Sequence, residues 1–234
     1  MNGIARQIWN DLPAVFASMI EGMDRSLGDI LDQLDEFGVA ENTVVVFMTD
    51  NGCPKQLPRN LPLRGHKITP YEGGTRVPMI ARWPGVTKPE TTCSDYLIIE
   101  DVFPSFLEVA GVTDYEQVGG KIDGVSFVPL LQGKRTADPE RAIFWHFPNT
   151  YDQPPYSSVR KGDWKLIYQH IARKLELYNL TEDIGEQNNL AAEEPEKLRE
   201  LATVLSDFLR EAKAPMSIDK ETGKSIASPI LHVE

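Results

Sequence analysis

"VVVFMTDNG", residues 44–52, joins a continuous apolar run to two polar side chains and a glycine. An apolar run without alternation is typical of a strand that is buried on both faces of a parallel sheet. Open α/β sheets bind ligands just beyond the carboxyl ends of such strands, which is where Asp50, Asn51 and Gly52 stand. These residue types are also common in turns. The stretch therefore predicts either a corner of a binding site or a plain turn.

A long amphipathic helix is predicted immediately before this strand. Asp11 and Pro13 suit a helix cap and a first turn, and apolar residues then recur at three-four spacing up to Phe37, with Gly38 as the stop. A helix followed by a buried strand is half of a βαβ unit, so the fold class is predicted as α/β. The strand that should precede the helix is not visible in the sequence, which predicts that the chain begins inside a domain.

A loop of unusual composition separates this strand from the next predicted strand, 77–83. Residues 61–76 contain two prolines, a glycine pair and mixed charges, which predict a loop held in one conformation rather than a flexible linker. Structured loops beside strand ends commonly carry function. A capped helix is predicted further on, over 101–110, with Pro104 in its first turn and Gly111 as its stop.

The sequence pattern changes near residue 141, where short apolar segments follow one another with turn signals between them. Three segments predict a small antiparallel sheet: 142–147, 157–169 and 174–180. A helix is predicted over 195–212, and the sequence after Pro215 has no period, as in an irregular tail. The predicted domains are 1–140 as part of an α/β domain, 141–214 as a sheet-and-helix subdomain, and 215–234 as the tail.

Composition limits the partners that the chain is expected to have. Its 234 residues are 41% hydrophobic, which is enough for a core, and 24 basic against 35 acidic residues give a net charge of −11. This acidity argues against a non-specific nucleic-acid surface. Two cysteines are too few for a disulfide framework, no apolar run reaches membrane-spanning length, and the amino terminus lacks the layout of a secretory signal. We expect no nucleic-acid partner and no membrane span.

Four motifs follow one another along the chain: TDNG with its upstream helix (19–52), LRGHK with EGGTRVP (63–85), SSVRKGDWKLI (157–167), and ELYNLTEDIGEQNNLA (176–191). In this order they resemble the carboxyl-terminal half of a type I sulfatase of the alkaline-phosphatase-like superfamily. The resemblance implies part of a large central sheet flanked by helices, with a small antiparallel sheet and a helix as the carboxyl-terminal subdomain. It also implies hydrolysis of an aryl or carbohydrate sulfate ester, in the periplasm or outside the cell.

The resemblance assigns Asp50 and Asn51 as ligands of a divalent cation, normally Ca²⁺, that also contacts the sulfate ester. The residue types agree, since a hard cation prefers oxygen ligands and a carboxylate and a side-chain amide provide them. Gly52 lets the backbone turn away from the ion. Calcium takes about six to eight oxygens, so two residues supply only part of its shell. In the family the remaining carboxylates lie nearer the amino terminus.

Lys67 matches the family lysine that contacts sulfate, and is the candidate catalytic residue of this chain. A compact ammonium suits a sulfate ester and stabilises negative charge that develops on the leaving oxygen. The alternative is a surface lysine paired with Glu72. His66, the neighbouring residue, is a second candidate for substrate contact, with an exposed loop position as its alternative.

The EGG-x-RVP signature at 72–78 is expected to be architectural. Its glycines permit tight backbone geometry, and Arg76 is expected to pair with a buried carboxylate. Arg160 and Lys165 are likewise expected to be structural parts of the small sheet.

His146 lies in FWHFP, which in the family lies near the rim of the cleft, and is the third candidate for substrate contact. Trp145 or Tyr156 would then form a platform for a sugar or aryl group. The alternative is that these residues are core aromatics at a strand end.

The family nucleophile has no counterpart in this sequence. A type I sulfatase uses formylglycine, made from the cysteine of C-x-P-x-R or a close variant. Cys53 begins CPKQL and Cys93 begins CSDYL, and neither fits. The formylglycine is therefore expected in a preceding amino-terminal half, with this chain a fragment or a truncated gene product.

Three functions stay open from the sequence. The first is a sulfatase portion that carries part of the calcium and sulfate site. The second is a phosphodiesterase or phosphonate hydrolase of the same superfamily, and the third is a non-catalytic sulfatase remnant. The residues around Lys67 favour the first over the second.

Overall fold

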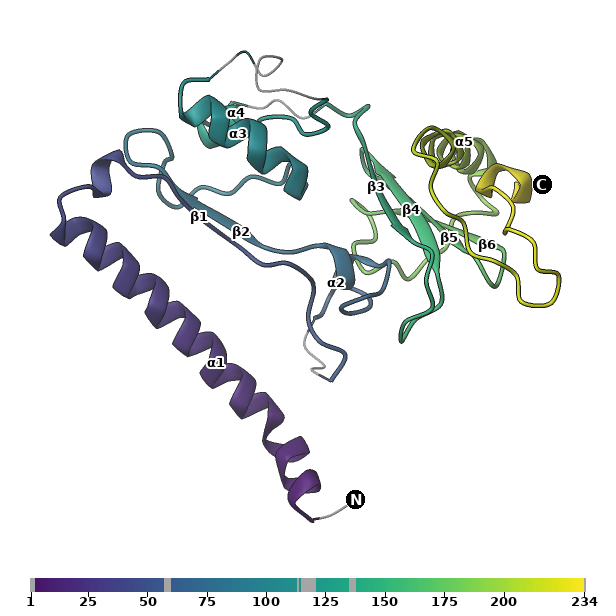
Figure 1. Cartoon of the computed structure of the whole chain (residues 1–234), viewed down its shortest axis with the longest axis horizontal. Coiled ribbons are helices and arrows are strands. Elements are labelled where there is room, and N and C mark those ends of the chain that lie inside the picture. Colours follow the sequence, from purple (N-terminus) through teal and green to yellow (C-terminus); the bar gives the residue numbers. More distant parts are fainter. Residues whose placement is uncertain (1–2, 57–59, 113, 115–120, 135–137, 234) are drawn as a thin grey trace. The chain divides into compact units, whose positions relative to one another are not determined.

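The computed structural model describes residues 3–56, 60–112, 114, 121–134 and 138–233, with side chains from residue 14 onward. The chain divides into two compact units, each built from two separate stretches of sequence (Figure 1). The first unit comprises Met1–Met48 and Pro78–Ala137, and the second comprises Thr49–Val77 and Asp138–Glu234. The division places the loop 49–77 with the carboxyl-terminal residues, whereas the sequence prediction assigned this loop to the domain 1–140.

The first unit contains a two-stranded sheet and most of the helices. Its elements are α1 (Gly3–Glu36), η1 (Ala40–Asn42), β1 (Val45–Met48), β2 (Met79–Arg82), η2 (Ile99–Asp101), α3 (Val102–Val109) and α4 (Val128–Leu131). The helix predicted over 101–110 is confirmed, with Pro104 in its first turn and Gly111 at φ +82° directly after its carboxyl end.

The burial of β1 differs from the sequence prediction. Its described partner is β2, which runs antiparallel with Val45 opposite Arg82, and all four residues of β1 are half-buried rather than buried on both faces. A short apolar run carries no information about strand direction, and a place for β1 in a parallel sheet stays a prediction.

Helix α1 starts earlier than predicted, at Gly3 rather than after Asp11, and continues through Pro13. In the sequence, apolar residues at 4, 8 and 12 extend the three-four spacing upstream, which favours helix on both sides of the proline even though Pro13 removes one backbone donor. No helix in the described part of the chain is long and apolar enough to cross a membrane.

The second unit is built on a four-stranded antiparallel sheet in the order β3-β4-β5-β6. Its elements are α2 (Glu72–Thr75), β3 (Ala142–Phe147), β4 (Tyr156–Lys161), β5 (Trp164–Gln169), β6 (Lys174–Asn179), α5 (Pro195–Glu211) and η4 (Pro229–His232). The predicted antiparallel sheet and carboxyl-terminal helix are therefore confirmed. A tight turn with Gly162 at φ +57° joins β4 to β5.

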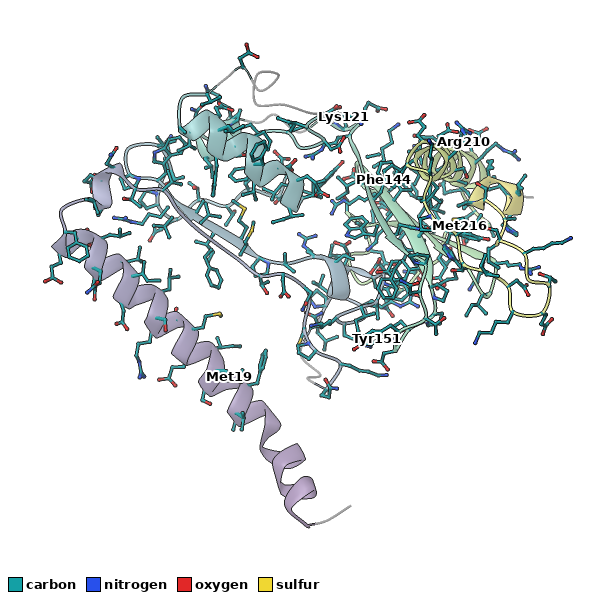
Figure 2. All side chains as sticks on the ribbon, viewed as in Figure 1. Met19, Lys121, Phe144, Tyr151, Arg210 and Met216 are labelled. Carbon is teal, nitrogen blue, oxygen red and sulfur yellow. The ribbon has the colours of Figure 1, made fainter. Side chains whose placement is uncertain are left out.

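Helix α5 covers one face of this sheet (Figure 1). Leu201 and Leu205 of the helix and Leu166 and Leu177 of the sheet are fully buried in one core cluster. Phe144 on β3, labelled in Figure 2, stacks on Phe208 of α5 with ring centroids 3.9 Å apart. Each fully buried leucine contributes roughly 1.5–3 kcal/mol to the free energy of folding, so this face fixes α5 firmly on the sheet.

The other face of the sheet has a different character. Because side chains alternate along a strand, Lys165 and Ile167 of β5 point away from the face covered by α5. Ile167 packs there with Tyr178 of β6 and with Tyr71 from the loop 49–77. The loop that carries the candidate site residues therefore lies against this second face.

The carboxyl-terminal segment is irregular but packed. Ile218 and Ser225 form an isolated antiparallel bridge, and Ile226 is buried in the same core cluster as α5. The Tyr168 hydroxyl donates to the Ala227 carbonyl at 3.0 Å, which ties the segment to β5.

Candidate functional site

Asp50 and Asn51 follow β1 directly, at the start of the second unit. Asp50 is exposed and Asn51 is half-buried. The Asn51 amide nitrogen Nδ2 donates to the Gly52 carbonyl at 3.0 Å, so the amide oxygen Oδ1 points the other way. The Gly52 N–H donates to the Gly74 carbonyl at 3.1 Å. The corner is thus fixed against the EGG turn rather than left as a mobile strand end.

Lys67 lies in a tight turn and its side chain is exposed. The His66 carbonyl accepts hydrogen bonds from both the backbone N–H and the hydroxyl of Thr69, at 3.0 and 2.7 Å. Ile68, directly after Lys67, has φ +80°, which is rare for a β-branched residue and is a form of backbone strain found most often at functional sites.

Two backbone hydrogen bonds bring the Lys67 turn and the Asp50–Asn51 corner into one structure. The Lys67 N–H donates to the Cys53 carbonyl at 2.8 Å, and the Gly52 N–H ties the same corner to Gly74 in the EGG turn. The sequence-predicted lysine and the predicted cation ligands are therefore neighbours along a short hydrogen-bonded path.

Glycines are required where the two segments meet. A Cβ on Gly52 would lie 1.9 Å from the Gly73 carbonyl oxygen, and a Cβ on Gly73 would lie 2.5 Å from the carbonyl oxygens of Arg64 and Gly65. Real Cβ atoms do not approach backbone this closely. The predicted architectural role of these glycines agrees with this geometry.

His66 is half-buried, and its ring nitrogen Nδ1 lies 2.9 Å from the Lys67 carbonyl. Since a carbonyl oxygen only accepts, this contact makes Nδ1 the protonated nitrogen of the ring. The contact ties the His66 ring to the Lys67 turn, and substrate contact by His66 stays a prediction.

His146 takes part in a hydrogen-bond chain within the second unit, and its own side chain is half-buried. Its Nε2 lies 3.0 Å from the Pro215 carbonyl, and its Nδ1 lies 2.8 Å from the Ser157 hydroxyl. The same hydroxyl lies 2.8 Å from Nε2 of His170. Both ring nitrogens of His146 therefore face protein groups, and its predicted contact with substrate stays a prediction.

The chain continues from His170 to the carboxyl-terminal segment. Nδ1 of His170 lies 2.8 Å from the Ser217 hydroxyl, which donates to the Pro148 carbonyl at 2.7 Å. His170 is fully buried, and this burial, together with the nearby His146, lowers its pKa to about 4. The ring of His170 is therefore neutral in the folded protein near pH 7.

The neighbouring aromatic candidates are packed inside the unit. Tyr156 is buried, stacks on Phe147 with centroids 5.8 Å apart, and has its pKa raised to about 12 by burial. The ring of Trp145 lies 5.7 Å from Nζ of Lys165. These contacts favour core aromatics over a substrate platform.

Glu72 is paired with residues other than Lys67. Its side chain is 2% exposed and lies 2.8 Å from Nζ of Lys165, 3.5 Å from Arg76 and 3.8 Å from Arg160. The alternative in which Lys67 pairs with Glu72 is thus wrong, whereas the expected pairing of Arg76 with a buried carboxylate is confirmed. Burial alone would raise the pKa of Glu72, but Lys165 and the two arginines outweigh it and lower the pKa.

A second carboxylate completes this buried cluster. Glu186 accepts from the Glu72 backbone N–H at 2.7 Å and lies 3.1 Å from Nζ of Lys165. Glu186 and Lys165 are both fully buried. Burial raises the pKa of Glu186 despite the nearby ammonium. The two carboxyl groups thus contact the same lysine, but the pKa of Glu72 is lowered and the pKa of Glu186 is raised.

Arg64 anchors the other end of the Lys67 turn. Its guanidinium lies 3.8 Å from the ring centroid of Tyr71, and it donates to the hydroxyls of Tyr71 and Tyr178 at 3.0 and 2.9 Å. Both tyrosine hydroxyls donate to Glu176. A bond from Arg64 to the Glu186 carbonyl at 2.8 Å links the two anchors.

Sequence reasoning missed the roles of Arg64, Glu176 and Glu186, and it gave Lys165 a structural role without naming its partners. One signal was present: in WKLIY, Lys165 occupies a position between apolar residues that alternation would bury. A buried lysine requires a carboxylate partner, but its sequence position does not say which one.

Asp50 and Asn51 are the two residues of this chain that the resemblance assigns to a cation. Among the described residues, no three His, Cys, Asp or Glu side chains gather in a metal-binding group. The Asp50 carboxylate and the Asn51 Oδ1 have the chemistry that Ca²⁺ prefers, and they fit as part of a shell completed by other ligands.

Cys53 has an environment unlike that of a nucleophile. Its side chain is half-buried, and burial raises the pKa of the thiol above its usual value. The thiolate is the reactive form, so this environment opposes reactivity.

Comparison with known proteins relates the whole arrangement to one family. Residues 6–112 match the family described as Sulfatase, and residues 66–214 match the family described as N-sulphoglucosamine sulphohydrolase, C-terminal. The chain is 36% identical to a sulfatase of Formosa agariphila over 84% of its own length and 39% of that protein. It is 29% identical to an N-acetylglucosamine-6-O-sulfatase of Bacteroides thetaiotaomicron, covering 88% of this chain and 37% of that protein.

Solved structures share the fold. A protein in complex with its substrate D-glucosamine-2-N,6-O-disulfate matches with a TM-score of 0.67 and 28% identity, over 83% of this chain and 39% of that one. A complex with k-i-k-neocarrahexaose matches with a TM-score of 0.74 and 23% identity, over 89% of this chain and 46% of that one. The chain thus spans about two fifths of the relatives' length. Its motifs, its fold and the family models agree that it belongs to the sulfatase family.

Proposed function

We propose that this chain supplies one wall of the active site of a sulfuric ester hydrolase. The observation that carries the proposal is the junction of the Asp50–Asn51 corner with the Lys67 turn, made by the bonds from Gly52 to Gly74 and from Lys67 to Cys53. The junction holds three groups in one structure: the Lys67 ammonium, the Asp50 carboxylate and the Asn51 amide oxygen. A sulfate ester needs such groups around its oxygens, because negative charge develops on the leaving oxygen as the S–O bond breaks.

Lys67 has the catalytic role in this proposal. Its ammonium has three donors and binds non-bridging or leaving oxygens of the ester, and it stabilises charge that grows in the transition state. The strained Ile68 and the bonds within the turn hold the lysine backbone before substrate arrives, so little reorganisation is needed.

Asp50 and Asn51 would hold a divalent cation, with Ca²⁺ as the proposed ion. When bound, such an ion supplies positive charge close to the ester oxygens. The chain's own contribution is to hold the Asn51 amide in one orientation, with Nδ2 bonded to the Gly52 carbonyl and Oδ1 turned away from it.

Two of the similar proteins support a carbohydrate substrate in this proposal. One relative is named an N-acetylglucosamine-6-O-sulfatase, and one solved structure holds D-glucosamine-2-N,6-O-disulfate. We therefore favour a carbohydrate sulfate over an aryl sulfate. The nucleophile is proposed to be a formylglycine outside these 234 residues, because neither Cys53 nor Cys93 has its motif.

The test is Lys67→Ala in a protein that joins this chain to an amino-terminal part with a formylglycine motif. We expect unchanged folding, since the side chain is exposed, and a turnover of a sulfate ester that is lower by on the order of a hundredfold to a thousandfold. Lys174→Ala removes another exposed lysine of the same unit and should leave turnover unchanged. Equal activity of the two variants would rule out the role of Lys67.

A further inference from the structure

Lys165 and Glu186 form a buried charged pair that the proposed reaction does not use directly. Both side chains are fully buried, and Nζ of Lys165 lies 2.8 Å from Glu72 and 3.1 Å from Glu186. Burying charged groups costs several kcal/mol per ion, and apolar side chains of similar volume often give equal or greater stability. We therefore ask which part of the structure this buried pair holds in position, since stability alone does not account for it.

Glu72 is held at two points. Lys165 binds its carboxylate, while Glu186 accepts a hydrogen bond from its backbone N–H at 2.7 Å. One contact fixes the side chain and the other fixes the backbone at the first residue of α2. The start of this short helix therefore cannot shift without breaking a buried, charge-assisted contact.

The position of α2 determines the position of the candidate site. Gly73 donates to the Arg64 carbonyl at 2.7 Å, and the Gly74 carbonyl accepts from Gly52 at 3.1 Å. Arg64 lies three residues before Lys67, and Gly52 follows Asn51 directly. A displacement of Glu72 is thus passed on to both halves of the site through main-chain bonds.

We propose that Lys165 and Glu186 are positioning residues that set the distance between Lys67 and the Asp50–Asn51 corner. Neither residue contacts substrate in this scheme, since both are buried beneath the turn. The catalytic meaning of the inference rests on the proposed function, but the geometric linkage is testable without any activity.

Hydrogen exchange of the backbone amides in this chain tests the linkage. In Glu186→Leu the carboxylate that binds the Glu72 N–H is lost, and we expect exchange at Gly52, Lys67 and Gly73 to accelerate on the order of tenfold to a hundredfold. Amides of α5 should accelerate much less, because that helix packs on the opposite face of the sheet.

Conservative and matched variants separate positioning from general stability. Glu186→Gln retains a carbonyl oxygen for the Glu72 N–H, so exchange in the loop should stay within about threefold of the wild type. Lys161→Met removes a lysine of β4 that also bridges two glutamates, Glu140 at 2.7 Å and Glu200 at 3.0 Å, but is 18% exposed. We expect this variant to leave the loop amides unchanged.

Lys165→Gln is the second test, and it should accelerate the same three loop amides. Uniform acceleration in α5 and in the loop, or no acceleration in the loop, would overturn the proposal. Failure of both Glu186→Leu and Lys165→Gln to fold would also count against it, because the pair would then hold the whole unit. Titration of the wild-type chain with inorganic sulfate tests the proposed function separately: an unmoved Lys67 amide resonance would argue against that function and leave the exchange result standing.

Discussion

Ile68 adopts a backbone conformation that its side chain disfavours, and it does so next to the candidate catalytic lysine. Such a conformation costs about 1–3 kcal/mol and persists only where the surroundings impose it. Here the surroundings are the Thr69 bonds to the His66 carbonyl and the bond from Lys67 to Cys53. Strain at this point favours a role for Lys67 over the alternative of an ordinary surface residue.

His170 gives a pH dependence that is testable in this chain. Its pKa is about 4 in the folded protein and about 6.5 when unfolded, so the unfolded state binds more protons between these values. Stability is therefore fully present above pH 6.5 and falls as the pH drops toward 4. The loss is at most about 3 kcal/mol. Urea unfolding followed at pH 7 and pH 4.5 measures it.

A His170→Gln variant isolates this effect from the carboxylates that titrate in the same range. The difference in unfolding free energy between pH 7 and pH 4.5 should be smaller in the variant than in the wild type. Equal differences in the two proteins would show that burial of His170 does not control acid stability.

Single residues were the hardest level to predict from sequence. The pairing of Arg76 with a buried carboxylate was expected from the EGG-x-RVP motif, and the structure shows it. The partners of Lys165 were not, since Glu72 and Glu186 come from distant segments. Long-range ion pairs are a property of the tertiary fold, and one sequence does not contain their distances.

At the level of elements, periodic segments were predictable and pairing was not. The strands β3 to β6 and helix α5 follow directly from alternation and three-four spacing. The antiparallel pairing of β1 with β2 was not predictable, because parallel and antiparallel strands bury the same apolar residues. The start of α1 was missed because a proline at a plausible first turn is also tolerated within a long helix.

Helix α1 carries an apolar stripe that is exposed along the described part of its length. Met19 is 65% exposed and is labelled in Figure 2, and exposed apolar side chains follow at intervals of four or seven residues: Met23, Ile30 and, directly after the helix, Phe37. Exposed stripes of this kind drive association. We expect the isolated chain to self-associate, and light scattering across a concentration series measures the average mass.

A pair of charge-adding variants tests this prediction. Met19→Glu places a carboxylate on the stripe and should lower the average mass. Ala17→Glu adds the same charge on nearly the opposite side of the helix, since two residues correspond to about 200° of rotation. A monodisperse wild-type monomer, or equal responses to both changes, would contradict the prediction.

At the level of the whole molecule, the chain spans only about two fifths of its relatives' length, and this limits the number of calcium ligands that it supplies. Asp50 and Asn51 provide two side-chain ligands, whereas calcium takes about six to eight oxygens. We therefore expect weak calcium binding by the isolated chain, lost in Asp50→Ala. Calorimetric titration measures it, and a submicromolar one-to-one affinity would show that further ligands lie within these residues.

The family could be predicted from the sequence because four motifs occur in a specific order. The matches of residues 6–112 and 66–214 to sulfatase family models confirm it. The candidate site was predictable only in part. Asp50, Asn51 and Lys67 belong to short motifs, but the bonds that join them involve backbone groups from three separate segments. Backbone contacts of this kind do not depend on the side chains, so the sequence shows them only where close packing requires a glycine.

The contact between Gly52 and Gly73 has a consequence for how the molecule can vary. At each position the obstacle to a side chain is a main-chain oxygen of another motif, which no substitution elsewhere can remove. A library randomised at both positions should therefore return glycine at both, with no compensating pairs among its survivors. We therefore expect the TDNG and EGG motifs, separated by nineteen residues, to be inherited as one unit. Recombination within residues 53–71 is harmless to their fit only when both parents carry both glycines.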